Sequence, residues 1–271
     1  MPPYKGPSKR PRPRVPRARL RGGAPRHPLA VRKAATLTAT LGIVHAVLIV
    51  LTVVLLKGRA PDMDATDAEI TAFYSDPDER RVVVFAGLYL LPFAGIAFIW
   101  FSVALRMWVA ASARRKNVLF SNVQLVCAVI YTGLLFVAGA SMSVVAASSE
   151  LSDTPIDPAY TRQFPQYGTA LLLIFAMRMA AMFVLTTTNL GRTSGILPRW
   201  FVLAGFAVAI GLLLTASLSA WLVLVFPTWI LMFCGILLNR ARKIPRGLVV
   251  VESDAVVRSR SIQQQSHPTA G

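Results

Sequence analysis

The charges of this 271-residue chain change sign from one gap to the next between its long apolar segments. Ten of its twelve carboxylates fall in two short stretches, 62–79 and 150–157, and the arginine clusters occupy the alternate gaps. A membrane imposes this order, because positively charged loops stay on the cytoplasmic side. Apolar stretches of about 18 residues or more are long enough to cross a bilayer. The pattern therefore predicts an all-α protein that crosses a membrane several times.

Composition agrees with a lipid environment. The chain is 55% hydrophobic and 15% charged, with a mean hydropathy of +0.56, whereas a soluble domain is about 45–50% apolar and about 25% charged. The net charge of +17 is compatible with nucleic-acid binding, but eleven of the 29 basic residues precede Ala34 and most others flank apolar segments. This placement suits an anionic inner leaflet. We expect the bilayer and its anionic headgroups as partners, and no nucleic acid.

Six spans are expected, at about 34–56, 82–105, 118–146, 167–190, 200–217 and 221–239. The forty uncharged residues 200–239 require an argument. One helix of that length would be about 60 Å long, twice the hydrocarbon thickness, and would place the basic residues 240–246 outside the cell. Two spans with a turn near 217–220 avoid both problems, whereas a break at Pro227 leaves only 12 residues for the last span.

The result is a six-helix transmembrane bundle of the plasma (inner) membrane, with both termini cytoplasmic. Residues 1–33 contain eight prolines and eleven basic residues, and they predict a disordered tail that touches anionic lipid headgroups. Residues 240–271 form a second cytoplasmic tail. Cys127 and Cys234 both lie in apolar segments, which argues against disulfides in the outer loops.

The first outer loop predicts a short helix. Thr66 and Glu69 have the spacing of a capping box, Pro77 ends the helix, and three apolar residues share one face that should lie on the bundle: Ile70, Phe73 and Tyr74. The carboxylates of 62–69 do not match the calcium-loop pattern, so a solvated acidic loop is expected in preference to a metal site. The second outer loop, 150–166, carries three prolines and is expected to be irregular.

Arg178 and His45 are the candidate ligand-binding residues, since each lies at the middle of an apolar segment. A central arginine costs roughly 2.5–3.5 kcal/mol on insertion scales and normally faces protein or water. No predicted span contains a carboxylate to pair with it. Arg178 therefore either binds an anionic or carbonyl-rich ligand or is held by neutral groups: backbone carbonyls, water, Gln124, Tyr131, Ser141 or Ser143. His45 is either part of that site or a core histidine bonded to one neighbour.

Motifs for known chemistry are missing from the sequence. It lacks the phosphate-binding loop of nucleotide-driven motors, the H-E-x-x-H zinc motif and any carboxylate pair in a span. We therefore expect no catalytic residue, metal or cofactor, and a non-enzymatic interaction or regulatory component, with a membrane protein as a possible partner. The alternative is a transporter or receptor for a small anionic or polar solute.

Two stretches carry a resemblance. One is Ala72-Phe73-Tyr74-Ser75-Asp76 with Arg80 and Trp100-Phe101, and the other is Gly195-Ile196-Leu197-Pro198-Arg199-Trp200. Together they resemble a broad group of uncharacterised multi-pass membrane proteins of high-GC bacteria. The resemblance implies a membrane topology, and it implies no activity.

Overall fold

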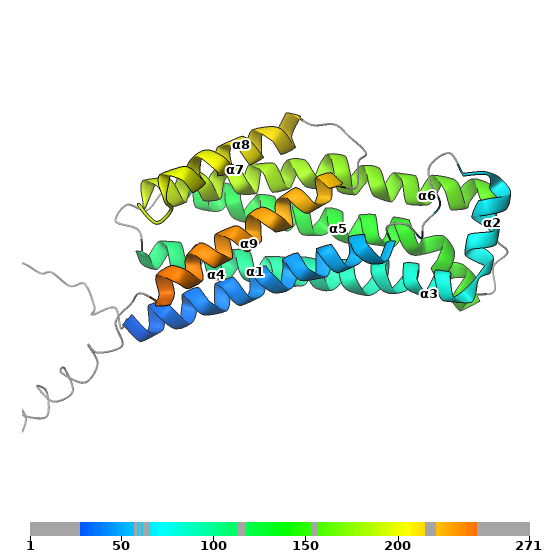
Figure 1. Ribbon diagram of the computed structural model, residues 1–271, viewed down its shortest axis with the longest axis horizontal. Helices are drawn as coiled ribbons and strands as arrows, with labels where there is room; N and C mark the ends of the chain where they lie inside the picture. The colour runs from blue at the N-terminus through cyan, green and yellow to red at the C-terminus, as the bar shows by residue number, and fades with distance from the viewer. Residues whose placement is uncertain are drawn as a thin grey trace, which may run out of the picture.

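The computed structural model describes residues 28–56, 59, 61, 65–112, 118–152, 157–214 and 221–242, and every regular element within these ranges is a helix (Figure 1). The predicted tails, 1–33 and 240–271, are shorter than expected, because residues 28–33 belong to the first long helix and residues 240–242 to the last. Residues 1–27 and 243–271, the predicted turn at 217–220 and the carboxylates Asp62 and Asp64 lie outside the described residues. Within them, five helices are long and apolar enough to cross a membrane. A shorter apolar helix, Arg199–Leu214, accompanies them.

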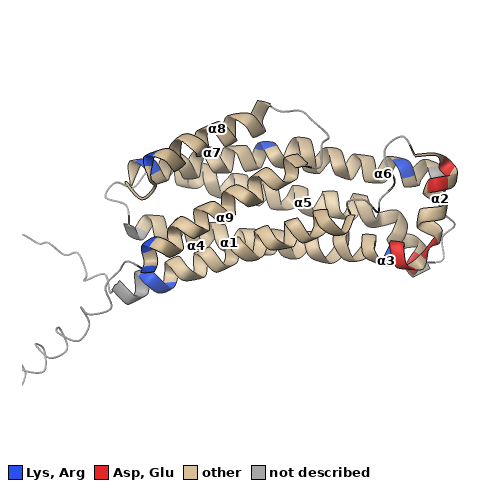
Figure 2. Ribbon diagram, in the orientation of Figure 1, with Lys and Arg blue, Asp and Glu red and all other residues tan. Residues whose placement is uncertain are grey.

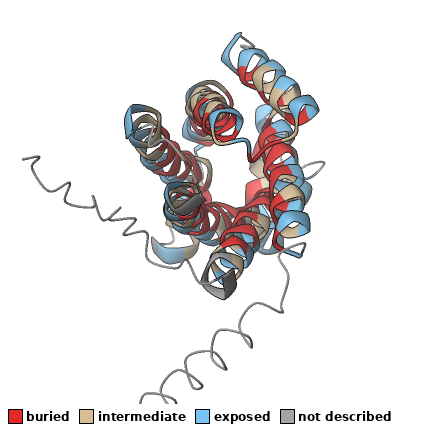
Figure 3. Cartoon of the chain, turned by 90° about the vertical axis from the view of Figure 1, so that its left-hand side faces the viewer, coloured by how far each residue is buried: buried red, intermediate tan, exposed pale blue. Residues whose placement is uncertain are grey.

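The long helices pack side by side in the order α9, α1, α4, α5, α7 and α8. Their bounds are α1 (Pro28–Leu56), α4 (Leu91–Ser112), α5 (Val118–Ser152), α7 (Met177–Thr193), α8 (Arg199–Leu214) and α9 (Trp221–Arg242). Viewed from one end, their buried residues face inward and their exposed residues face outward (Figure 3). The first residue of α1 and the last residue of α9 lie at the same end of the bundle (Figure 1).

Aromatic side chains fill the centre of the bundle. The ring of Phe98 lies 4.9 Å from Tyr131 and 4.9 Å from Phe183, and Phe226 lies 5.6 Å from Phe98. All four residues are almost fully buried. The outward side chains, such as Trp100 and Leu203, are large, apolar and exposed. This apolar exterior is what a helix bundle presents when lipid surrounds it.

Two π-helical segments interrupt the long helices: η1 (Ala86–Leu90), between α3 and α4, and η2 (Leu171–Ala176), between α6 and α7. Pro92 follows η1 and accounts for it, because proline has no N–H to donate and its ring crowds the preceding turn. Gly87 of η1 also lies against α5. A Cβ added to Gly87 would lie 2.7 Å from the carbonyl oxygen of Gly139, so glycine lets these two backbones touch.

The region of the last two predicted spans folds as two helices. Pro227 lies inside a continuous α9, and the helices are separated by residues 215–220, which lie outside the described part of the chain. The 16 residues of α8 rise about 24 Å, less than the hydrocarbon core of about 30 Å. Of the small-residue pairs in α8, Gly205 and Ala209 are buried, whereas Ala207 and Gly211 face outward.

Short helices cover one end of the bundle: α2 (Asp67–Ser75), α3 (Pro77–Phe85) and α6 (Pro158–Ala170), beside the last turns of α5. We call this group the acidic cap, because the described carboxylates lie there, while the other end carries arginine and lysine (Figure 2). The prediction of an irregular second outer loop is wrong at residues 150–152, which end α5, and from residue 158 onward, where α6 begins. Pro158 occupies the first helical position, where its missing N–H costs nothing, and α6 then continues through η2 into α7.

Candidate functional site

Arg178 follows η2 near the middle of the bundle and is half-buried. Its Nη1 donates a hydrogen bond of 2.9 Å to the carbonyl of Ile174, four residues earlier in the same helix and inside η2. Of the alternatives raised by the sequence, the structure therefore shows a backbone carbonyl. Two of the proposed side-chain partners are used elsewhere, since Gln124 donates to Thr187 and Ser143 donates to Gly139.

His45 is fully buried against the aromatic core, with its ring 4.8 Å from Phe98 and 5.9 Å from Tyr131. Its Nδ1 donates to the carbonyl of Ala94 at 2.9 Å, because a carbonyl oxygen can only accept. Its Nε2 has no partner among the described residues. None of the ring contacts or hydrogen bonds of His45 involves Arg178, so the structure does not bring the two candidate residues together.

The acidic cap begins with the capping box that the sequence predicts. The backbone N–H of Thr66 donates to Glu69 Oε2 at 2.7 Å, and the backbone N–H of Glu69 donates to Thr66 Oγ1 at 3.3 Å. The backbone N–H and the hydroxyl of Thr66 both donate to the Glu69 carboxylate, at 2.7 and 2.9 Å, and these two hydrogen bonds lower the pKa of Glu69. The box orients α2 so that Ile70 and Tyr74 are buried with Val83 of α3, and the predicted apolar face is confirmed. Burial raises the pKa of Tyr74 to about 12.

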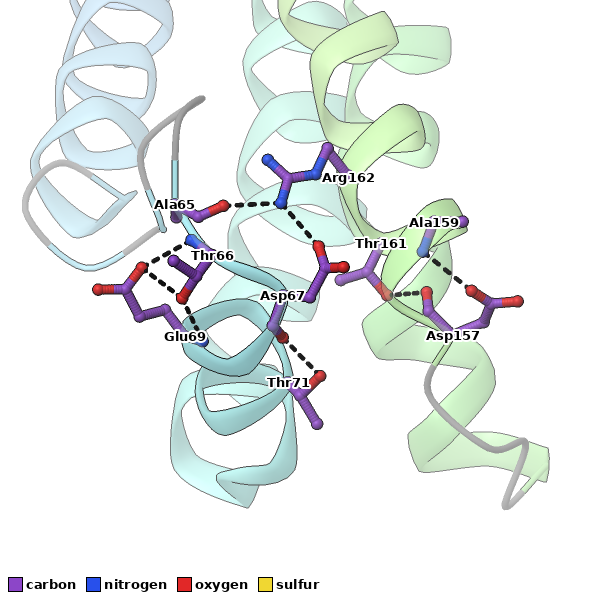
Figure 4. A network of polar contacts seen from close by, with 9 residues as sticks. All are labelled: Ala65, Thr66, Asp67, Glu69, Thr71, Asp157, Ala159, Thr161 and Arg162. Atoms are coloured by element: carbon purple, nitrogen blue, oxygen red, sulfur yellow. Dashed lines mark hydrogen bonds and ion pairs between the residues drawn. The ribbon is translucent and has the colours of Figure 1, made fainter.

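Arg162 ties α6 to the start of α2 (Figure 4). Its Nη2 donates to the carbonyl of Ala65 at 2.7 Å and to Asp67 Oδ1 at 2.8 Å. On the same helix, Asp157 accepts a hydrogen bond from the backbone N–H of Ala159 at 2.9 Å and so caps α6. This network joins two segments that are far apart in the chain, because Arg162 and Asp67 are 95 residues apart.

Arg80 of α3 is the second connection in the cap. Its Nε donates to Glu150 Oε1 of α5 at 3.0 Å, and its Nη1 donates to the carbonyls of Tyr74 and Ser75 at 2.9 and 3.2 Å. Those two carbonyls belong to the last turn of α2, where carbonyl groups have no N–H partner within the helix. One guanidinium therefore joins three helices.

The charges of the cap are structural. Each described arginine there pairs with a carboxylate: Arg59 with Glu79, Arg80 with Glu150, Arg81 with Asp78 and Arg162 with Asp67. The three other described carboxylates, Glu69, Asp76 and Asp157, stabilise helix N-termini. Within the described ranges, no three metal-ligating side chains gather. These ion pairs were not predicted from the sequence, and the signal for them is that the four arginines lie in or beside otherwise acidic loops.

Exposed aromatic side chains follow one side of α6. Tyr160 is 58% exposed and Tyr167 is 65% exposed, with Phe164 between them at 6.2 Å from the ring of Tyr160. Residues seven apart share a face of a helix. Aromatic residues of this kind are enriched in protein–protein contacts, so this aromatic row is the part of the cap that has the chemistry of an interface.

Comparison with models of protein families finds no match, and neither the curated proteins nor the solved structures show a similarity to this chain.

Proposed function

We propose that the chain is a six-span protein of the plasma (inner) membrane and that it acts as a non-enzymatic interaction or regulatory component. In this proposal both termini lie in the cytoplasm and the acidic cap faces outside. The distribution of charge supports this orientation, because the described carboxylates gather at one end and Arg32, Lys33, Arg240 and Arg242 lie at the other. The two separate helices α8 and α9, in a region that one span cannot account for, support six spans.

The height of the cap carries the functional part of the proposal. The continuous helix 158–193 rises about 54 Å, and the hydrocarbon core accounts for about 30 Å of this. With Thr193 near the cytoplasmic boundary, roughly 24 Å remain, more than the headgroup layer of about 5–8 Å. Tyr160 then lies in water beyond the lipid. A large exposed aromatic side chain in water, on a helix fixed by Arg162, suits a docking surface for another membrane protein.

The test is photo-crosslinking in intact cells with benzoylphenylalanine at Tyr160 or Tyr167. We expect an adduct with one protein of defined mass, which is lost when the remaining aromatic side chains of the row are replaced by serine. The matched control is the same probe at Leu203, which is exposed on α8 and should react with lipid. Absence of a protein adduct from both α6 positions, in a protein that is inserted and folded, would contradict the docking role.

The alternative, a transporter or receptor for a small anionic or polar solute, keeps support from one observation. Arg178 is a half-buried cation in a part of the bundle where the described residues offer no carboxylate. A thermal-shift panel of solutes, run on the wild type and on Arg178→Leu, separates the two functions. A ligand at 100 times its Kd stabilises by about 2.7 kcal/mol. A shift present in the wild type and absent from a folded Arg178→Leu protein would favour the transporter or receptor.

A further inference from the structure

At the end of the bundle opposite the acidic cap, the described basic side chains have no carboxylate partner among the described residues. The described basic residues there are Arg32, Lys33, Arg106, Arg192, Arg199, Arg240 and Arg242. Three of them bond to neutral acceptors: Arg106 to Asn122, Arg192 to Asn189 and Arg240 to the carbonyl of Gly195. Arg32 and Lys33 have no side-chain partner among the described residues. The acidic cap differs, because every described arginine there has a carboxylate, so the counter-charge at the basic end does not come from the described residues.

A continuous exposed row begins at this basic pair and runs along the outer side of α1. Its members alternate at spacings of four and three residues: Lys33, Leu37, Thr40, Val44, Val47, Leu51 and Val54. Spacings of four and three keep residues on one face of a helix. Arg32, Lys33, Thr36, Leu37 and Thr40 line an open groove at the start of this row. The row is therefore cationic at one end and apolar along the rest, which is the polarity of a phospholipid.

Thr40 differs from the other threonines of α1 within the described residues. Thr36, Thr38 and Thr52 each donate their hydroxyl proton to the carbonyl four residues earlier, at 2.8–3.1 Å. The hydroxyl of Thr40 is exposed and has no such bond. An unpaired hydroxyl in an apolar environment costs free energy until it finds an acceptor. Thr40 lies two turns, about 10 Å, from Lys33 along the helix, on the side of the ester carbonyls when the Lys33 ammonium reaches toward the headgroups.

We propose that this face of α1 is a binding site for an anionic phospholipid. Arg32 and Lys33 bind the phosphate, Thr40 donates to an ester carbonyl, and an acyl chain lies along Leu37 and Val44. The proposal rests on the proposed membrane location, but it does not require a particular orientation. Basic residues near an anionic surface contribute about a factor of five in affinity each, so removing both should weaken binding about 25-fold.

The experiment is native mass spectrometry of the full-length protein in detergent, titrated with phosphatidylglycerol or with phosphatidylcholine of the same acyl chains. We expect one tightly retained phosphatidylglycerol and at least tenfold weaker phosphatidylcholine. Arg32→Gln with Lys33→Gln should weaken phosphatidylglycerol by about 25-fold. The matched control, Arg192→Gln with Arg199→Gln, removes two exposed cations from the same end and should change the affinity less than threefold. Inorganic phosphate should not compete, because it lacks the ester and the acyl chain.

Thr40→Val supplies a second measurement that does not depend on charge. The wild type should bind ester-linked phosphatidylglycerol several-fold more tightly than its ether-linked analogue, which has no carbonyl, and Thr40→Val should bind the two equally. The proposal is overturned if both double variants lose the same affinity, if phosphatidylcholine binds as well, or if phosphate displaces the lipid. It is also overturned if the α1 variants change the oligomeric state instead, since the row would then contact another helix. Loss of lipid binding would leave the orientation and the docking role of the cap untouched.

Discussion

Replacing Arg80 by alanine should loosen the acidic cap without unfolding the bundle. The guanidinium makes three hydrogen bonds of 2.9–3.2 Å, and the side chain is only 16% exposed. Its loss leaves the partly buried Glu150 and the carbonyls of Tyr74 and Ser75 without this donor. Breaking a buried pair costs about 3–5 kcal/mol, and an exposed pair is worth 0–1 kcal/mol. Because the burial of the Arg80–Glu150 pair is intermediate, we expect Arg80→Ala to lower the stability of the cap by about 2–3 kcal/mol.

The assay is hydrogen exchange of the α2 and α3 amides in the detergent-solubilised protein, read against the amides of α7 as an internal reference. A loss of 2–3 kcal/mol should speed exchange in the cap about 30- to 150-fold when exchange follows the opening equilibrium. Arg81→Ala is the matched control, because its pair with Asp78 is 3.5 Å long and both side chains are largely exposed. It should change exchange by less than a factor of about three. Equal effects from Arg80→Ala and Arg81→Ala would refute the reasoning.

Three further outcomes are expected. Gly87→Ala should destabilise the bundle by about 1–3 kcal/mol through overpacking. Gly133→Ala is the control, because open space surrounds its Cβ position, and it should leave the Tm unchanged. Equal shifts in Tm would contradict the close contact between Gly87 and Gly139. The pKa of the Glu69 carboxyl is lower in the folded protein than its unfolded value of about 4.5. The ionised carboxylate therefore stabilises the fold fully above that unfolded pKa, and this stabilisation is lost as the pH falls through the folded pKa. Protection of the α2 amides, taken as the ratio of intrinsic to measured exchange rate at each pH, should therefore fall on acidification, and Glu69→Gln should remove that part of the pH dependence. Arg178→Leu should insert and fold, because the hydrogen bond of Arg178 is to the carbonyl of Ile174 in the same continuous helix. Loss of the folded protein would show instead that the guanidinium holds the bundle together.

The apolar segments and local helix signals predict much of this fold. The capping box at Thr66 depends on residues three apart, and the division of residues 200–239 into two helices follows from length and charge, so both can be predicted from the sequence. The sequence does not predict the extent of α6, because the prolines at 155, 158 and 165 favour an irregular loop, whereas Pro158 begins the helix and Pro165 lies within it. The length of α6 depends on its packing against α2 and α5, which no local pattern encodes.

The candidate site divides in the same way. The positions of Arg178 and His45 at the middle of apolar segments follow from counting along the sequence. Their orientations do not, because which neighbour each side chain meets depends on how α1, α4 and α7 are arranged around the aromatic core. The pairs of Arg80 with Glu150 and of Arg162 with Asp67 join residues 70 and 95 positions apart, and only the packing of the cap places them together.

Cysteine labelling from outside intact cells tests the central claim most directly. The native Cys127 and Cys234 are buried, so an impermeant maleimide should report only on introduced cysteines. The side chain of Asp78 in the acidic cap is 88% exposed, so Asp78→Cys should be labelled in intact cells. Arg199→Cys at the basic end should be labelled only after permeabilisation. Labelling of Arg199→Cys in intact cells, or of both sites alike, would contradict a bundle that crosses the membrane with its acidic cap outside.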